Sequence, residues 1–387
     1  MSPLINYGED VAFMKKHTNI LELVAPDNPN AKVAVAPGYQ ARIMTSTADG
    51  DSSTSFGWIN REVIADGTRR PQINVFGGED RFWLGPEGGQ FSIYFDPGAE
   101  FELPVWRVPD PIDWCEWDAT GTATASEATF EKNFDVTNWS GTVLSMTAGR
   151  TVRVMSKART DEILGVDCSG VSYVGYETEN YLINTGSEKW TKEGGLLSIW
   201  ILGMLTPSPG TTVVIPFKTG SEDELGPVVN DAYFGKVPAD RLKVDTDKGV
   251  MFFSGDGTYR SKIGLSPLRA KPTLGSYDAS GGSLTVVNYS LPEEPDEYVN
   301  AMWEHQEKPF EGDTVNAYND GPPEPGAKPL GPFYELESSS PALAPAPGEK
   351  KVHIHRTFHF TGDKDKLNEI AEKLLGASLA EITAALK

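Results

Sequence analysis

The apolar residues of this chain recur mostly with a period of two, in short runs that turn-forming residues separate. Segments 283–291 and 352–360 alternate well between apolar and polar positions. The 39 glycines and 28 prolines make up about 17 % of the 387 residues, against roughly 12 % in average proteins. A period of two is typical of strands with one buried face, and abundant Gly and Pro indicate many turns. The sequence therefore predicts a mainly β protein.

Other segments predict the order of strands and helices. Two apolar runs flank Ser254-Gly255-Asp256-Gly257, so we expect a hairpin over 250–265. A short helix is expected at 7–17. In the Pro/Gly-rich stretch 321–349 we expect long loops around a strand and no linker. Further strands are expected at 21–24, 32–35, 119–131, 143–146 and 151–155.

A strong helical pattern occurs at the C-terminal end. Apolar residues recur at helical spacing over 363–375, Gly376 is typical of a helix end, and Ser378-x-x-Glu381 is a capping box that opens a last short helix. We therefore predict a single antiparallel β-sandwich domain over 1–387, with a helical tail at 363–387.

The charge of the chain restricts its partners. The formal net charge is −21, whereas nucleic-acid binding and electrostatic membrane binding both require basic surfaces. No apolar stretch reaches 18 residues, and residues 1–16 carry no signal-peptide pattern. Cys115 and Cys168 show no metal-site spacing and are expected to be free thiols. These features favour a cytoplasmic protein that binds neither nucleic acid nor membranes.

Two acid-rich segments are the first candidates for a site. In 76–89, paired glycines bracket Glu79, Arg81, Trp83 and Glu87, a composition that suits a sugar because indoles pack on C–H groups and carboxylates accept hydroxyl protons. The alternative is a tight turn around a buried tryptophan. In 331–342, Glu335 and Glu337 would point the same way on a strand, about 6.6 Å apart at Cα. Such a pair can supply an acid and a base, or it can be a solvated edge.

The remaining candidates are cations, amides and histidines. Arg260 and Lys262 would share one strand face and could bind a hydroxyl-rich or anionic ligand. His353, His355 and His359 share a face in 352–360, but without an evident third ligand we expect no metal and no cofactor. For each group the alternative is a turn or a polar surface. Further candidate binding residues are Asn180, Trp303, Asn319 and Asp320.

The order of these motifs resembles the galactose mutarotase (aldose 1-epimerase) superfamily. The strand at 334–338, the turn Pro347-Gly348-Glu349, the strand at 352–360 and the closing helix are similar to the C-terminal end of that family. Gly77-Gly78 resembles its paired glycines. The runs GGEDRFWLGPEGG, YRSKIG, YNDGP and GPFYELESSSPAL resemble an uncharacterised branch of the superfamily over nearly the full length. The resemblance implies a β-supersandwich that binds a small-molecule carbohydrate.

Carried over by position, the family's catalytic glutamate falls on Glu337, with Glu335 as the alternative. The family's two central histidines have no counterpart: Glu79 stands where one should follow the glycines, and no histidine occurs between His17 and His305. Mutarotation needs a base for the anomeric hydroxyl and an acid for the ring oxygen. The acid is then expected to be Lys262, His355 or a tyrosine. The expected activity is isomerisation of the aldose 1-epimerase type, with a hydrolase, a lyase or a non-catalytic sugar-binding protein as alternatives.

Overall fold

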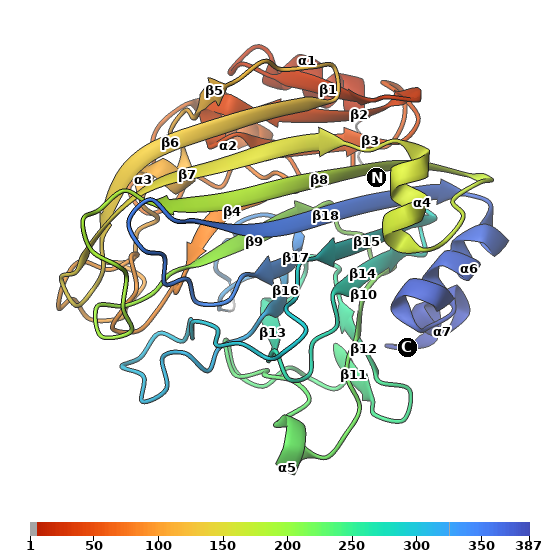
Figure 1. The fold of residues 1–387 in the computed structure, drawn as a ribbon. Coiled ribbons are helices and arrows are strands. Elements are labelled where there is room, and N and C mark those ends of the chain that lie inside the picture. Colours follow the sequence, from red (N-terminus) through yellow and green to blue (C-terminus); the bar gives the residue numbers. More distant parts are fainter. Residues whose placement is uncertain (1–5, 325) are drawn as a thin grey trace.

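Two β-sheets pack face to face, and a small third sheet lies beside them near the N-terminus (Figure 1). The computed structural model describes residues 6–324 and 326–387. Residues 1–5, part of the segment without a signal-peptide pattern, and residue 325, in the Pro/Gly-rich stretch, lie outside the described part. The predicted fold class, a mainly β antiparallel supersandwich with short C-terminal helices, is confirmed.

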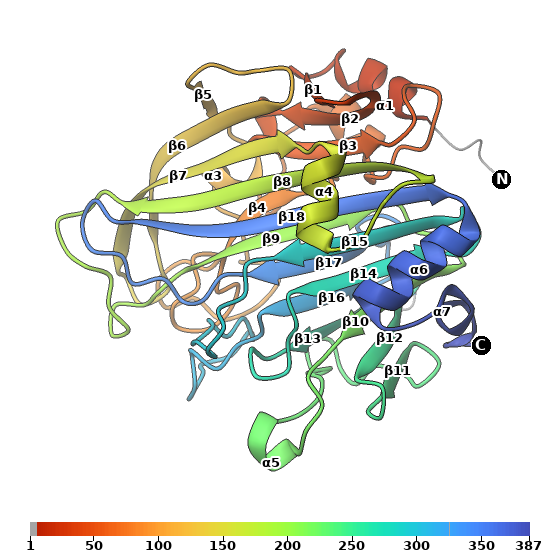
Figure 2. The same ribbon diagram turned by 45° about the vertical axis from the view of Figure 1, so that its right-hand side comes forward.

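The larger sheet has ten strands, and all its pairings are antiparallel. Its longest strands, β7, β8 and β18, lie side by side across the molecule (Figures 1 and 2). In spatial order the strands are β11 (Leu242–Asp245), β12 (Val250–Ser254), β10 (Thr211–Pro216), β14 (Thr273–Asp278), β15 (Ser283–Tyr289), β18 (Lys350–Gly362), β8 (Val171–Asn184), β7 (Val143–Val154), β6 (Glu127–Thr137) and β5 (Asp118–Thr120).

The second large sheet has five strands and is buried on both faces. Its order is β13 (Ser261–Leu265), β16 (Val315–Asn319), β17 (Tyr334–Ser339), β9 (Ser198–Leu205) and β4 (Arg81–Gly85). Every residue of these strands is buried. One face packs on the ten-stranded sheet, and loops cover the other, which we call the outer face.

The third sheet and several short helices complete the fold. β1 (Leu21–Ala25), β2 (Asn28–Ala36) and β3 (Arg42–Thr47) form the small sheet. The opening helix α1 (Tyr7–Met14) begins where the sequence predicted it and ends earlier. The other short helices are η1 (Pro37–Tyr39), α2 (Arg61–Asp66), α3 (Asp110–Asp113), α4 (Lys157–Leu164) and α5 (Glu222–Leu225).

The predicted C-terminal helices α6 (Lys364–Leu375) and α7 (Leu379–Ala384) are present and cover part of the ten-stranded sheet (Figure 2). Asp363 caps α6, and Gly376 ends it in the left-handed conformation with φ 73°. The Ser378–Glu381 capping box opens α7. Leu367, Ile370 and Leu375 are buried against residues of the sheet in one apolar cluster. The helices are therefore part of the core packing.

Replacing Ile370 by alanine is expected to lower the free energy of unfolding by about 2–5 kcal/mol, because the substitution leaves a cavity between α6 and the sheet. The exposed Lys364 in the same helix provides a matched control, and Lys364→Ala should change stability by less than about 0.5 kcal/mol. Urea unfolding of both variants measures the difference. Equal stabilities would mean that α6 is not anchored through Ile370.

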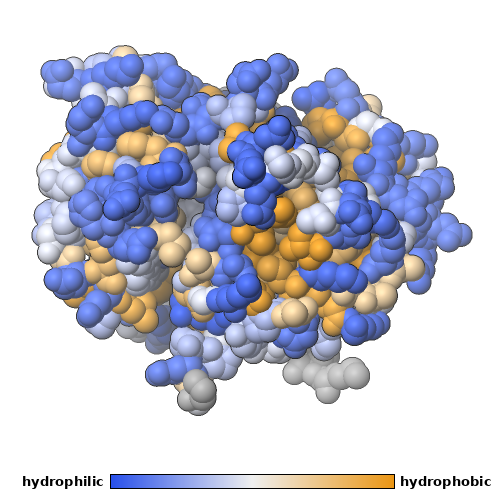
Figure 3. All heavy atoms as spheres, turned by 90° about the horizontal axis from the view of Figure 1, so that it is seen from below, coloured by the Kyte–Doolittle hydropathy of each residue, from blue (hydrophilic) through white to orange (hydrophobic). Residues whose placement is uncertain are grey.

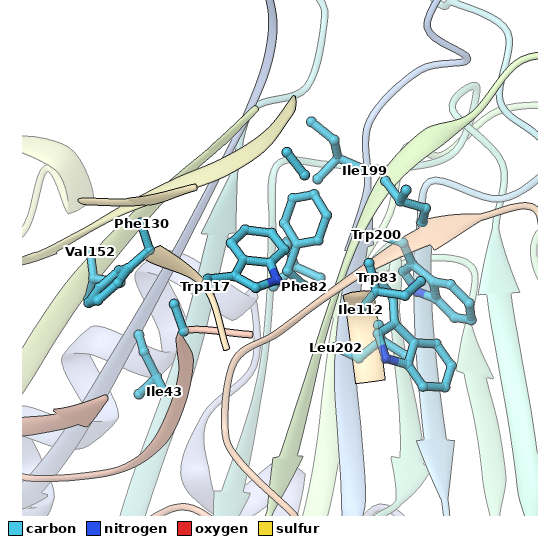
Figure 4. Packing of buried hydrophobic residues seen from close by; sticks show 14 of the residues in the cluster. Ile43, Phe82, Trp83, Ile112, Trp117, Phe130, Val152, Ile199, Trp200 and Leu202 are labelled. Atoms are coloured by element: carbon cyan, nitrogen blue, oxygen red, sulfur yellow. The ribbon is translucent and has the colours of Figure 1, made fainter. Parts of the chain in front are cut away.

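The largest apolar cluster joins the sheets and extends to the outer face (Figure 4). Trp117 packs edge-on against Phe82, with ring centroids 5.1 Å apart. At the other end of the view, Trp83 and Trp200 lie together beside Leu202, and the indole centroids are 5.6 Å apart. These two indoles form an apolar floor on the outer face of the five-stranded sheet.

The surface seen from below is largely hydrophilic, with an apolar area near its middle (Figure 3). This distribution accords with the net charge of −21. Within the described residues, none of the helices combines the length and apolarity needed to cross a membrane. Both cysteines are free, as predicted.

The predicted hairpin over 250–265 is wrong. β12 pairs with β10 and β11 in the ten-stranded sheet, whereas β13 pairs with β16 in the five-stranded sheet. The residues between them cross from one sheet to the other, where Asp256 binds Arg241 and Asn319. Gly/Asp-rich turns occur both in hairpins and in connections that cross from one sheet to another, so the sequence pattern alone did not distinguish the two.

Candidate functional site

Strand β17 presents two glutamates on the outer face. Tyr334 and Ser338 point toward the ten-stranded sheet, where their hydroxyls bond Ser276 and His353 at 2.8 Å each. Because side chains alternate along a strand, Glu335 and Glu337 point the other way. Their shared direction follows from the alternation that the sequence showed.

Glu337 is completely buried and is held by two donors from neighbouring strands. Lys262 Nζ lies 3.0 Å from Glu337 Oε2, and Trp200 Nε1 donates to the same oxygen at 2.9 Å. Oε1 has no hydrogen-bond partner among the described residues. A buried carboxylate oxygen without a partner is costly, so it indicates a position where a ligand or water donates.

Lys262 is a buried cation surrounded by carboxylates. Burial lowers the pKa of Lys262, but the charges of Glu337, Glu87 and Glu335 together more than offset this, and the net direction is upward. The ammonium also lies 4.7 Å from the centre of the Trp200 ring, a cation–π contact. Lys262 therefore carries its proton at neutral pH and forms an ion pair with Glu337.

Arg81 holds the second glutamate of β17. Its guanidinium forms an ion pair with Glu335 and lies 4.9 Å from the centre of the Trp83 ring. Burial raises the pKa of Glu335 to about 7, although the charge of Arg81 opposes the shift. Glu335 and Glu337 thus have different partners and occupy different electrostatic environments.

Glu87, Arg260 and Trp303 come from the loops that cover the outer face. Burial raises the pKa of Glu87 to about 7, while Lys262 and Arg260 lower it and Glu337 raises it further. The Arg260 guanidinium lies 3.9 Å from the centre of the Phe234 ring. Trp303 packs on Trp106, with centroids 5.9 Å apart. Glu87 and Arg260 therefore belong to the electrostatic surroundings of the Lys262–Glu337 pair.

A small cavity of about 20 Å³ lies beside Lys262 and Trp200, the two residues that hold Glu337. It has room for about one water molecule. Its charged lining residues are Lys262 and Asp313, and Trp200, Tyr233 and Asn316 supply most of the remaining polar and aromatic wall. A sugar ring does not fit this volume, so the covering loops must move when a ligand of that size binds.

Three residues of the site were not among the predicted site residues: Trp200, Tyr233 and Asp313. Tyr233 OH donates to Asp313 Oδ2 at 2.6 Å. The centre of the Tyr233 ring lies 5.4 Å from Lys262 Nζ. These residues come from β9 and from two loops that are far apart in the sequence. Only the strand register and the loop packing bring them to Glu337.

Three predicted residues lie on the opposite side of the five-stranded sheet, between the two large sheets. His355 Nδ1 bonds the Ser338 hydroxyl at 2.9 Å, and His359 Nε2 bonds Glu79 Oε2 at 2.7 Å. Asn180 donates to the Thr178 carbonyl at 3.0 Å. The sheet separates His355, Glu79 and Asn180 from Glu337. Strand alternation directs His355 and Asn180 into the sandwich, and Glu79 lies in the bend before β4.

Asn319 and Asp320 hold the backbone of the covering loops. The Asn319 side chain bonds Gly257 N at 2.8 Å and the Tyr259 carbonyl at 2.9 Å. Asp320 accepts from Tyr318 OH at 2.9 Å and from Gly331 N at 2.8 Å. These contacts are those of turn-forming side chains, the alternative considered for them from the sequence.

Comparison with protein families assigns the chain. The family DUF6786, described as a family of unknown function, matches residues 5–386. The chain belongs to this family. No curated protein matches the sequence.

Solved structures place the DUF6786 fold among known folds. The Slr1438 protein of Synechocystis sp. PCC 6803 is 12 % identical, over 89 % of this chain and 96 % of that one, with a TM-score of 0.50. A galactose mutarotase-like protein from Lactobacillus casei ATCC 334 is 11 % identical, over 88 % of this chain and 100 % of that one, with a TM-score of 0.46. A galactose mutarotase related enzyme from Lactobacillus acidophilus is 9 % identical, over 89 % of this chain and 97 % of that one, with a TM-score of 0.45.

The buried histidines predict how the stability of this DUF6786 protein depends on pH. Burial lowers the pKa of His353 to about 3 and of His355 to about 4. The unfolded chain takes up these protons below about pH 6.5 and the folded chain does not, so stability should fall by up to about 1.4 kcal/mol per pH unit per histidine as the pH drops from about 6.5 to 4. Urea unfolding across this range measures the slope.

A matched control distinguishes His353 and His355 from an exposed histidine. His353→Gln/His355→Gln should flatten the acid slope, whereas substitution of the exposed His17 by glutamine should leave it unchanged. An acid slope that persists in the double variant would assign the loss of stability to other groups.

Proposed function

We propose that this protein is a carbohydrate-active enzyme that interconverts the anomers of a sugar, with Glu337 as the base. The observation that carries the proposal is the buried Glu337 carboxylate, which has one oxygen held by Lys262 and Trp200 and the other free of partners in the described residues. A fixed carboxylate with one free oxygen suits acceptance of a hydroxyl proton.

The neighbours of Glu337 support the role of a base. Lys262 places a positive charge beside the carboxylate and orients it, and its own raised pKa makes Lys262 a poor proton donor near neutral pH. Trp83 and Trp200 supply the apolar surface against which sugar C–H groups pack. His355 has no part in this proposal, because it bonds Ser338 on the other side of the sheet.

The test is acceleration of mutarotation by the purified protein. Freshly dissolved α-glucose, α-galactose and a panel of other aldoses and uronic acids are followed by polarimetry, and binding of each is followed by saturation-transfer NMR. The expected result is acceleration above buffer for at least one sugar that also binds. Binding without acceleration would favour a non-catalytic sugar-binding protein, and the absence of both would remove the proposal.

A further inference from the structure

We propose that Asp313 donates the proton to the ring oxygen and forms the acid–base pair of the site together with Glu337. This inference rests on the proposed function and adds the donor that it lacks. Asp313 is the one acidic residue among the described residues that line the cavity beside Lys262 and Trp200.

The backbone of β13 places the Asp313 carboxylate directly over the sheet. Gly264 faces the same side as Lys262, and a Cβ at Gly264 would lie 2.1 Å from Asp313 Oδ2. Only a residue without a side chain permits this approach. The carboxylate therefore occupies the outer face where the side chain of residue 264 would otherwise lie.

Strand order sets the distance between the two acids. Gly264 pairs with Asn316, and Asn316 pairs with Glu337, so β16 lies between Glu337 and Gly264, the residue over which the Asp313 carboxylate sits. Two inter-strand spacings amount to roughly 10 Å between the backbones. Glu335 and Glu337, in contrast, lie side by side on one strand. The Asn316 side chain lies between the two acids and donates to Tyr233 OH at 3.2 Å, so the loop that carries Tyr233 must move before one ligand can contact both carboxyl groups.

The loop over the site fixes Asp313 with two donors. Tyr233 OH donates to Oδ2 at 2.6 Å and Asn230 Nδ2 donates to the same oxygen at 2.9 Å. Reciprocal backbone hydrogen bonds of 2.8 Å between Asn230 and Gly264 attach the loop to the edge of the sheet. Because both donors bind Oδ2, Oδ1 is the oxygen that is left to carry and transfer a proton.

The two acids have different electrostatic surroundings. Burial raises the pKa of Asp313, and the hydrogen bonds from Tyr233 and Asn230 and the charge of Lys262 offset this only in part. Glu337 instead contacts the Lys262 ammonium at 3.0 Å. Glu87 also has a raised pKa but does not line the cavity.

The reaction conserves every atom and proton. The Asp313 carboxyl gives its proton to the ring oxygen as the bond between the ring oxygen and C1 breaks, and Glu337 takes the proton of the anomeric hydroxyl. The product is the open-chain aldehyde. After rotation about the C1–C2 bond the ring oxygen attacks the other face of C1, Glu337 protonates the carbonyl oxygen, and Asp313 recovers its proton from the ring oxygen.

The experiment compares Asp313→Asn with Glu87→Gln and with the exposed Glu311→Gln as a control, by polarimetry across pH. Asp313→Asn should lower kcat by about 10²–10⁴-fold with little change in KM. The activity that remains should no longer show the high-pH limb, which is the fall in wild-type activity as Asp313 loses its proton. Glu311→Gln should match the wild type. Wild-type kcat in Asp313→Asn, or loss of the high-pH limb in Glu87→Gln instead, would overturn the assignment of Asp313.

Tyr233→Phe provides a second test that leaves Asp313 in place. Removal of a donor to the carboxylate raises the pKa of Asp313, so the high-pH limb should move to higher pH. An unmoved limb contradicts the proposal even if Asp313→Asn fails to fold. A wild-type protein that accelerates no sugar removes the proposed function and this inference together, whereas an active wild type with an unaffected Asp313→Asn removes this inference alone.

Discussion

Replacing Arg150 by methionine is expected to lower the free energy of unfolding by about 3–5 kcal/mol, because it leaves a buried aspartate without its cation. Arg150 and Asp80 form an ion pair between the sheets, and both side chains are 0 % exposed. Asp80 keeps only neutral donors such as Thr178, whose hydroxyl bonds Oδ2 at 2.9 Å. Urea unfolding at pH 7 measures the loss.

A double variant separates the cost of the unpaired charge from the value of the pair. Arg150→Met/Asp80→Leu removes both charges and should be more stable than Arg150→Met alone, because an apolar replacement of a buried pair is often close to neutral. If Arg150→Met lost less than about 1 kcal/mol, Asp80 would have to be solvated or protonated in the folded protein. A double variant less stable than the single one would assign a structural value to the pair itself.

The parts of the fold that local sequence determines were predictable. Helix α6 follows from apolar spacing and from Gly376, and α7 follows from the Ser378–Glu381 capping box. Strand β18 and the common direction of Glu335 and Glu337 follow from a period of two. In each case the signal lies within about a dozen residues, the range over which periodicity and caps act.

The pairing of the strands was not predictable from periodicity and helix caps. β12 and β13 have the pattern of a hairpin, yet they belong to different sheets. Alternation placed His355 on a polar strand face but did not show that this face points into the sandwich, away from Lys262. Asp313 reaches the site only through the register of β13 with β16 and the missing side chain of Gly264. A single sequence contains no direct record of that register.

Replacing Glu337 by glutamine is expected to lower kcat for mutarotation by about 10²–10⁴-fold while the protein still folds and binds the sugar. The carboxamide keeps the shape of the side chain, and its oxygen can still accept from Trp200 Nε1 and Lys262. What it loses is the basicity needed to take the anomeric proton. KM should therefore change little, since the contacts to the bound sugar remain.

Glu335→Gln is the matched comparison, because Glu335 lies two residues away on the same face of β17 and is held by Arg81. Its loss of activity should be the smaller of the two if Glu337 is the base. Polarimetry with freshly dissolved α-sugars gives kcat and KM, and urea unfolding shows whether each variant is folded. If Glu337→Gln turned over at the wild-type rate while Glu335→Gln did not, Glu335 would be the base. The pKa of Glu335, which burial raises to about 7, would then require activity to rise with pH through that value, because a base must lose its proton before it acts.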